Sequence, residues 1–259
     1  MSTTRSAEDD RTDRTDGTRE GHGRPGRILS GVAVALGCVL FLGGFAWGAL
    51  LYQPYAVPTG SMAPTINAGE RVLAQRIDGA EVRRGDVVVF NEAEWGDLPM
   101  VKRVVAVGGD EVACCTSGRL TVNGKPVDES YLPADTPASV AGIPRTTVPE
   151  GRLFLLGDER AGSLDSTAHL QEVGRGSVPR DVVVARVDAV AWPMDGMLAR
   201  PDGFAKLPGG ISEPGPLKAV VAAVVGGAVL ILGGAAYGPV AARFGRASRQ
   251  RRTGRVRGA

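Results

Sequence analysis

Two long apolar runs dominate the pattern of hydrophobic and polar positions along the 259-residue chain. They are residues 28–51 ("ILSGVAVALGCVLFLGGFAWGALL") and residues 219–242 ("AVVAAVVGGAVLILGGAAYGPVAA"), and neither contains a charged residue. A helix needs roughly 20 apolar residues to cross the about 30 Å of hydrocarbon in a bilayer. Both runs exceed that length, so the pattern predicts two transmembrane helices.

Each run has a competing interpretation. The first is also compatible with a cleaved secretory signal, but the apolar part of such a signal has roughly 7 to 15 residues, and Ala46-Trp47-Gly48 is a poor cleavage site. The second is also compatible with a buried helix of a soluble domain. A helix that is apolar all round needs a sheath, however, and the rest of the sequence does not offer one. Membrane spanning is therefore favoured for both runs.

Between the two runs, short segments rich in β-branched residues alternate with turn signals, a pattern typical of an all-β domain. The clearest segments are 71–77, 86–90, 100–107, 152–156 and 181–192. Asn123-Gly124 predicts a hairpin turn, because both residue types tolerate positive φ. The proline-rich stretch 132–151 is expected to be a long surface loop. The pattern predicts mainly β structure between the membrane helices.

Charge adds an orientation to this picture. Arginines flank the outer ends of both runs: Arg19, Arg24 and Arg27 precede the first, and Arg243, Arg246, Arg249, Arg251, Arg252, Arg255 and Arg257 follow the second. Because cytoplasmic flanks retain Lys and Arg, both termini are expected to be cytoplasmic. The chain would then be a two-pass protein of the plasma membrane, in contact with lipid. Its net charge of only +2 argues against a dedicated nucleic-acid binder.

These patterns divide the chain into six parts. Residues 1–27 interleave charges of both signs with almost no apolar residues, so they are expected to be a disordered cytoplasmic tail. The first membrane helix (28–51), an extracytoplasmic β domain (52–200), a linker (201–218), the second membrane helix (219–242) and a basic cytoplasmic tail (243–259) are expected to follow.

The three cysteines do not suffice for a multi-disulfide framework. Cys38 lies in the first apolar run and is expected to be a small apolar residue there. Cys114 and Cys115 are adjacent, so they are either free thiols or a vicinal disulfide. Metal ligation needs further ligands, and the sequence shows no suitable spacing. We therefore predict neither a metal site nor a cofactor.

Ser61, in "PTGSMAPTI" (58–66), is a candidate nucleophile, but a serine hydroxyl needs a base that accepts its proton. The chain has two histidines. His22 falls in the predicted tail, and His169 lies in a polar loop where a solvated side chain is expected, which argues against a Ser-His-Asp triad.

Lysine is the remaining base, provided that burial lowers its pKa from about 10.4. Lys102 lies in the apolar segment 100–107, the surroundings that such a shift requires. The other lysines outside the tails, Lys125, Lys206 and Lys218, follow a turn, lie in the predicted linker, or adjoin a membrane helix.

Four ordered segments resemble the successive motifs of the type I signal peptidases: "PTGSMAPTI" (58–66), "RRGDVVVF" (83–90), "VKRVVAVGGD" (101–110) and "GDERAGSLDS" (157–166). Residues 120–132 and 176–187 are also similar to that family. The resemblance implies a largely β catalytic domain held between membrane helices. It further implies a serine protease with a Ser/Lys dyad that removes signal peptides from exported preproteins, cutting after small residues of Ala-x-Ala type.

The resemblance also implies residue roles. Ser61 would be the nucleophile and Lys102 the general base, and the Thr59 hydroxyl would bind the oxyanion together with the Ser61 N–H. Ser163 would hold the lysine amine, with Asp165 as a nearby acidic partner. The walls of the substrate pockets would be Tyr55, Val57, Met62, Met100 and Val101. Without the resemblance, the polar residues would be ordinary turn residues and the apolar ones core residues.

Two positions depart from the family pattern. Glu159 stands where the family usually has Asn, and Thr167 stands where it usually has the Arg that pairs with the aspartate. Arg160 or Arg175 are candidates to replace that partner of Asp165. The departures motivate an alternative, a non-catalytic membrane-anchored peptide-binding homologue, although both Ser61 and Lys102 are retained.

A second alternative is a self-cleaving Ser/Lys protein like certain repressors. The two membrane anchors and the lack of a DNA-binding segment argue against it.

Overall fold

The computed structural model describes residues 24–96, 98–115 and 118–254. The chain divides into two compact units, one made of the residues up to Gly43 and from Ala223 onward, the other of Gly44–Ala222. Two long helices, α1 (Arg24–Leu51) and α3 (Leu217–Gly254), each begin in one unit and end in the other. The strands all belong to the second unit.

Both segments that were predicted to span the membrane form helices. Ile28–Leu51 in α1 and Leu217–Tyr237 in α3 are long and apolar enough to cross a bilayer. Helix α3 continues through Gly254, so residues 243–254 of the predicted tail are helical. The predicted disordered tail 1–27 lies outside the described residues up to residue 23, and residues 24–27 form the first turn of α1.

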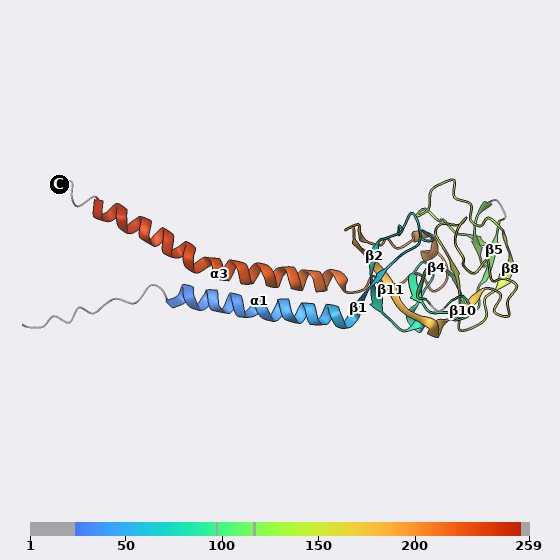
Figure 1. Ribbon diagram of the computed structural model, residues 1–259, viewed down its shortest axis with the longest axis horizontal. Helices are drawn as coiled ribbons and strands as arrows, with labels where there is room; N and C mark the ends of the chain where they lie inside the picture. The colour runs from blue at the N-terminus through green and yellow to red at the C-terminus, as the bar shows by residue number, and fades with distance from the viewer. Residues whose placement is uncertain (1–23, 97, 116–117, 255–259) are drawn as a thin grey trace, which may run out of the picture. The chain divides into compact units, whose positions relative to one another are not determined.

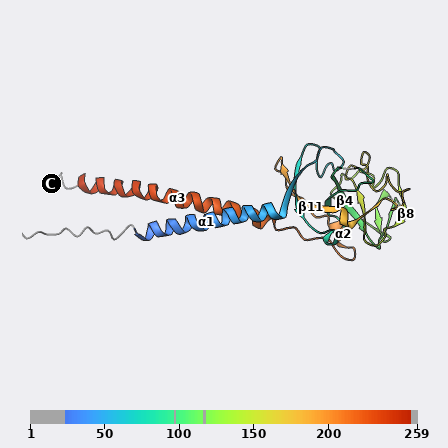
Figure 2. The ribbon, with the colours of Figure 1, turned by 60° about the horizontal axis from the view of Figure 1, so that its bottom comes forward.

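Within the first unit, α1 and α3 lie side by side and touch at small residues (Figures 1 and 2). A Cβ atom on Gly37 would lie 2.8 Å from the Gly227 carbonyl oxygen, and one on Gly227 would lie 2.5 Å from the Phe41 nitrogen. The Ser30 hydroxyl donates to the Gly234 carbonyl at 2.7 Å. Small residues let membrane helices approach this closely, and interhelical hydrogen bonds add to the packing.

The second unit is mainly β. Its larger, eight-stranded antiparallel sheet has the order β1-β2-β11-β3-β4-β9-β10, with β12 beside β11. These strands are β1 (Tyr52–Ala56), β2 (Arg71–Arg76), β3 (Val87–Phe90), β4 (Met100–Val107), β9 (Arg152–Leu156), β10 (Ser177–Pro179), β11 (Val183–Trp192) and β12 (Gly196–Met197). The predicted strands 71–77, 86–90, 100–107, 152–156 and 181–192 are thereby confirmed.

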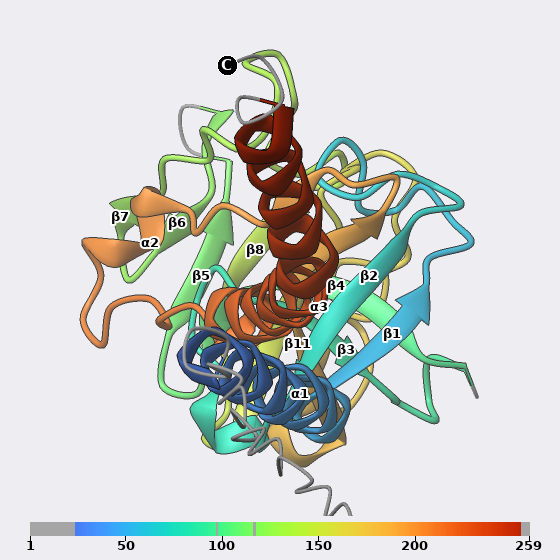
Figure 3. The ribbon, with the colours of Figure 1, turned by 90° about the vertical axis from the view of Figure 1, so that its left-hand side faces the viewer.

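A smaller, four-stranded sheet has the order β7-β6-β5-β8. Its strands are β5 (Glu111–Cys114), β6 (Thr121–Val122), β7 (Lys125–Pro126) and β8 (Ile143–Thr147). Figure 3 shows β5, β6 and β7 with the short helix α2 (Asp202–Ala205) on one side of the unit and β1, β2 and β3 on the other. Single 3-10 turns occur at Gly79–Glu81 and Arg180–Val182.

Two turn predictions have different outcomes. Asn123 and Gly124 both have positive φ, 54° and 72°, and connect β6 to β7 as predicted. The prediction of a long surface loop over 132–151 is wrong for residues 143–147, because they form β8. Ile143 and Thr146 are buried against β5, whereas Pro144 is exposed on this edge strand, a position where its missing N–H does no harm.

The segment 201–218, predicted as a linker, packs against the β unit. Phe204 and Leu207 are 0 % and 5 % exposed in the same apolar cluster as Leu120 and Val122. A Cβ atom on Gly203 would lie 1.9 Å from the Asp128 carbonyl oxygen, so α2 touches the backbone that follows β7. Apolar side chains buried in this way make the segment part of the domain core.

Cys114 and Cys115, left open between free thiols and a disulfide, form a vicinal disulfide at the end of β5.

Candidate active site

Ser61 lies in the loop that joins β1 to β2. The Val57 N–H donates to the Glu70 carbonyl at 2.8 Å, which closes the loop at its base. Met62 and Ile66 are fully buried, and they pin the loop to the core between β2, β3 and β11. Ser61 itself is half-buried beside these anchors. The local sequence thus holds one hydroxyl at the surface of a rigid turn.

Lys102 lies on β4, paired with Val88 of β3, and is only 4 % exposed. Its Nζ atom is 2.9 Å from Ser61 Oγ, within the range that direct proton transfer requires. Burial lowers the pKa of Lys102, whereas the nearby carboxylates of Asp165 and Asp158 act in the opposite direction. A buried amine therefore faces the candidate nucleophile.

Asp165 belongs to the loop after β9 and is held by hydrogen bonds. Its Oδ2 accepts from the Gly157 N–H at 2.9 Å, and its Oδ1 accepts from the Thr167 hydroxyl at 2.7 Å and the Thr167 N–H at 3.0 Å. Arg160 does not replace the missing arginine, because its guanidinium pairs with Glu129 at 2.6 Å. Thr167 thus satisfies Asp165 with hydrogen bonds in place of an ion pair.

Ser163 lies against the nucleophile segment. A Cβ atom on Gly157 would be 2.1 Å from Ser163 Oγ and 2.5 Å from the Ser61 carbonyl oxygen, so only glycine fits between them. Ser163 Oγ is buried and has no hydrogen-bond partner in the described part of the chain. A hydrogen bond from Ser163 to the Lys102 amine, which the resemblance implies, is therefore not formed in this arrangement.

Sequence reasoning missed Asp158, which lies between Gly157 and Glu159. It forms a buried ion pair with Arg103, at 2.6 Å, and both side chains are at most 1 % exposed. The Arg103 guanidinium also stacks over the Tyr131 ring, 4.0 Å from its centroid. An available signal was the Gly-Asp pair immediately after the buried strand 152–156.

Of the other predicted site residues, Thr59 is near the nucleophile, with its Oγ1 3.5 Å from Ser61 Oγ. Tyr55, Met100 and Val101 are partly exposed and so offer surface to a substrate. Val57 and Met62, however, are 3 % and 0 % exposed and form part of the core. They therefore offer almost no surface to a substrate and would only support the residues that line a pocket.

His169 is not the solvated side chain that the sequence suggested. Its ring stacks on Trp95 with centroids 4.4 Å apart, and its side chain is 18 % exposed. Its Nδ1 lies 2.6 Å from Glu172 Oε1. The prediction failed because Trp95 is distant in sequence and meets His169 only in the folded chain.

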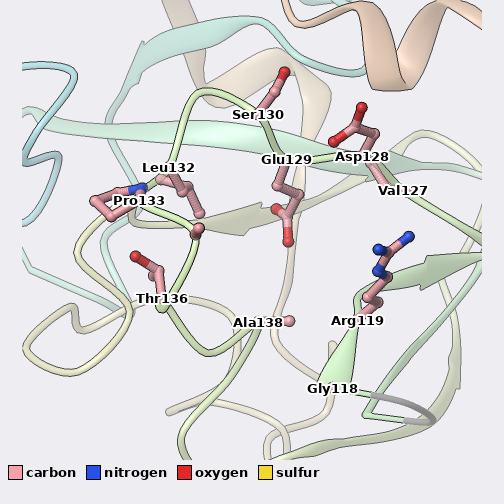
Figure 4. A pocket seen from close by; sticks show the side chains of 11 residues that line it. Gly118, Arg119, Val127, Asp128, Glu129, Ser130, Leu132, Pro133, Thr136 and Ala138 are labelled. Atoms are coloured by element: carbon pink, nitrogen blue, oxygen red, sulfur yellow. The ribbon is translucent and has the colours of Figure 1, made fainter.

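Two cavities of about 420 Å³ each lie around the loop that precedes β8. In Figure 4, which shows one of them, the Glu129 carboxylate lies between Arg119 and Thr136. The second cavity adjoins the nucleophile segment at Ala63 and Pro64. Within the described ranges, no group of three or more His, Cys, Asp or Glu side chains is arranged to hold a metal ion.

Two apolar helices and a mainly β unit in which a serine hydroxyl faces a buried amine have the build of a membrane-anchored serine peptidase. The sequence matches the family described as "Signal peptidase, peptidase S26" over residues 28–192. The chain therefore belongs to the signal peptidase family, as its motifs predicted. Its function within that family is the removal of signal peptides from preproteins.

Two individual relatives, from Mycobacterium leprae and Bacillus subtilis, agree with this assignment. A probable signal peptidase I of Mycobacterium leprae is 30 % identical over 223 residues, covering 64 % of this chain and 75 % of that protein. Signal peptidase I T of Bacillus subtilis is 33 % identical over 156 residues, covering 57 % and 77 %. A crystal structure of a signal peptidase I from Enterococcus faecalis is 24 % identical, covers 40 % of this chain and 94 % of that one, and has a TM-score of 0.31.

Proposed function

We propose that this chain is a Ser/Lys endopeptidase of the plasma membrane that cleaves exported preproteins after small residues. The observation that carries the proposal is the 2.9 Å separation between Lys102 Nζ and Ser61 Oγ, with Lys102 almost fully buried. A neutral amine at this distance is a competent general base.

In the proposed reaction, Ser61 Oγ attacks the scissile carbonyl while its proton passes to the neutral Lys102 amine. The Ser61 N–H and the Thr59 hydroxyl donate to the oxyanion of the tetrahedral intermediate. The Lys102 ammonium then gives its proton to the leaving amine, which releases the mature chain and leaves the signal peptide as an ester on Ser61. Lys102 next takes a proton from a water molecule whose oxygen attacks the ester carbonyl. As the bond between Ser61 Oγ and the acyl carbon breaks, Lys102 gives this proton to Ser61 Oγ, and the signal peptide leaves with a free carboxyl group.

The surroundings of Lys102 serve both halves of this cycle. Burial favours the neutral amine that begins each step. The carboxylates of Asp165 and Asp158 favour the ammonium ion that forms as the proton is transferred. The charge of Asp158 is already balanced by Arg103, so Asp165 is the more effective of the two. Asp165 is therefore proposed as a positioning and electrostatic residue.

The substrate is proposed to bind as an extended chain. Tyr55, Met100 and Val101 would contact it directly, with Val57 and Met62 behind them. Alternate side chains of an extended chain point the same way, so shallow apolar pockets would select small residues at alternate positions. Because the signal peptide is itself an apolar helix in the bilayer, anchoring the enzyme by α1 and α3 brings its cleavage site within reach.

The test is cleavage of a preprotein by the full chain in detergent. Ser61→Ala and Lys102→Met are each expected to lower kcat/KM by at least about a thousandfold, because nucleophile and base act as a unit. Lys125→Met is the matched control, since Lys125 is exposed on β7. Near-normal cleavage by either dyad variant would rule the dyad out. Peptide binding without turnover by the wild type would favour the non-catalytic alternative.

A further inference from the structure

A cavity of about 420 Å³ next to the nucleophile segment is not used by the reaction proposed above. Its walls are Ala63, Pro64, Pro133, Asp135, Thr136, Pro137, Asp158, Glu159, Arg160 and Ala161. The Ala63 N–H donates to the Gly60 carbonyl at 2.9 Å, so the wall begins within one turn of Ser61. Peptide and ligand pockets commonly have about 300 to 1,000 Å³, enough here for one or two residues.

Glu159 is held in a defined place between this cavity and Ser61. Its backbone N–H donates to the Ser61 carbonyl at 3.1 Å. Its carboxylate accepts a hydrogen bond from the Gly162 N–H through Oε2. The Glu159 side chain is therefore hydrogen-bonded within its own loop, and the Glu159 backbone is hydrogen-bonded to Ser61. These two contacts hold the carboxylate at a fixed position relative to Ser61 and to the peptide bond that is cut.

The residues that line the cavity and the proposed signal-peptide contacts lie on opposite sides of the dyad residues along the chain. Tyr55 of β1 and Val101 of β4, which are proposed to contact the signal peptide, precede Ser61 and Lys102 along the chain. Ala63 and Pro64 follow Ser61 and line the cavity. An extended substrate that contacts β1 and β4 before the nucleophile would thus reach this cavity after it.

The four charged side chains that line the cavity differ in whether an ion pair neutralises them. Asp158 is balanced by Arg103, and Arg160 is balanced by Glu129, each at 2.6 Å. Asp135 and Glu159 form no ion pair with any residue that the structure describes. The remaining walls are mostly alanine and proline. Apolar walls with two free carboxylates suit a lysine or arginine, whose aliphatic stem packs on apolar surface while its head reaches a charge.

We propose that this cavity receives the second and third residues of the mature chain, and that Asp135 and Glu159 select for lysine or arginine at these two positions. This specificity rests on the proposed function, since it describes the other half of the same substrate. Carboxylates at the rim of a site mainly change which substrate is preferred and how fast a charged substrate associates. Salt screens both effects.

The test uses preproteins that are identical up to the cleavage site and carry lysine, glutamine or glutamate at the second and third mature positions. We expect the wild type to prefer the lysine over the glutamate substrate about five- to tenfold in kcat/KM, from two partly exposed charge pairs. The double variant Asp135→Asn/Glu159→Gln is expected to reduce this ratio to about twofold or less. Gln at position 159 retains an acceptor for the Gly162 N–H.

Asp181→Asn, an exposed carboxylate outside the cavity lining, is the matched control and should leave the ratio unchanged. Raising the salt concentration should shrink the wild-type ratio. A wild-type ratio near one, or an undiminished ratio in the double variant, would overturn this proposal while leaving the peptidase function standing. Failure of the wild type to cleave any of the three substrates would instead overturn the proposed function and this specificity with it.

Discussion

Two adjacent basic residues on β4 differ in the charge state that their proposed roles require. Lys102 and Arg103 are both buried, at 4 % and 1 % exposed. Arg103 stays charged because a guanidinium does not lose its proton in proteins, and Asp158 compensates that charge in a two-bond pair. Lys102 forms no ion pair with any residue in the described part of the chain and contacts the Ser61 hydroxyl instead. Exchange of the two residue types would leave a permanent charge beside the nucleophile, so their order matters for the proposed chemistry.

The effect of Asp165 on Lys102 gives a prediction about pH. The Asp165 charge raises the pKa of Lys102 against the effect of burial, so Asp165→Asn should lower that pKa further. Because the neutral amine is the proposed base, the acid limb of the kcat/KM profile should move to lower pH. The maximal rate should also fall, since Asn cannot accept all the hydrogen bonds that Asp165 receives.

The measurement is a pH–rate profile of preprotein cleavage by the wild type, Asp165→Asn and the remote control Asp181→Asn. A lower maximal rate alone is what a purely structural role would give. An acid limb that stays in place, or moves to higher pH, would contradict the electrostatic role of Asp165.

At this scale the sequence predicted the residues that carry chemistry better than those that support them. Ser61 and Lys102 stand out because histidine is unsuitable and the motifs are ordered, and the structure brings the two together. Gly157 and Asp158 were missed, because close approach and ion pairing depend on segments that meet only after folding. Likewise, no local pattern shows that the Thr167 hydroxyl takes over from an arginine.

At the scale of elements, the segment after β12 joins the core of the β unit, although it was predicted to be only a linker to the second apolar helix. Arg200 donates to Asp86 at 3.1 Å and to Asp188 at 2.7 Å, which ties the start of the segment to β11 and to the residue before β3. Helix α2 then inserts Phe204 into the cluster formed with the smaller sheet. The linker prediction for 201–218 relied on the high proline and glycine content of this segment. That composition gave no weight to the few apolar residues that anchor the segment in the core.

Removal of the Phe204 side chain tests this packing. Phe204→Ala should lower the free energy of unfolding by about 3 to 5 kcal/mol, since the ring is fully buried. Val173→Ala is the control, because Val173 is fully exposed, and it should change stability by less than about 0.5 kcal/mol. Urea unfolding in detergent gives both values. Equal stability of the two variants would mean that 201–218 behaves as the linker first expected.

The strands made of buried apolar runs were predictable and the strands that contain proline were not, for a physical reason. Strands β3, β4 and β9 carry continuous or nearly continuous buried apolar residues, a pattern visible without knowledge of the fold. Strands such as β8 and β10 have three to five residues, include a proline, and form because a neighbouring strand offers hydrogen bonds. Tertiary pairing, not local preference, determines those segments.

At the scale of the whole molecule, the charge pattern predicts how the chain is inserted. Helix α1 leads into β1 and helix α3 leaves after β12 and α2, so the β unit is bracketed by the two apolar helices. The arginines outside both helices favour a cytoplasmic location for both termini. The β unit, with Ser61 and Lys102, would then face the outside, where the cleavage sites of exported preproteins emerge.

Single-cysteine labelling in intact cells checks this orientation, in a chain whose three native cysteines are replaced. Asp181→Cys, an exposed position in the β unit, should react with a membrane-impermeant maleimide added to intact cells. Ser248→Cys, beyond the apolar part of α3, should react only after the cells are permeabilised. Labelling of both positions after permeabilisation is the control for reactivity. The reverse pattern in intact cells would place the site on the cytoplasmic side, where it would not meet exported preproteins, and would contradict the proposed topology.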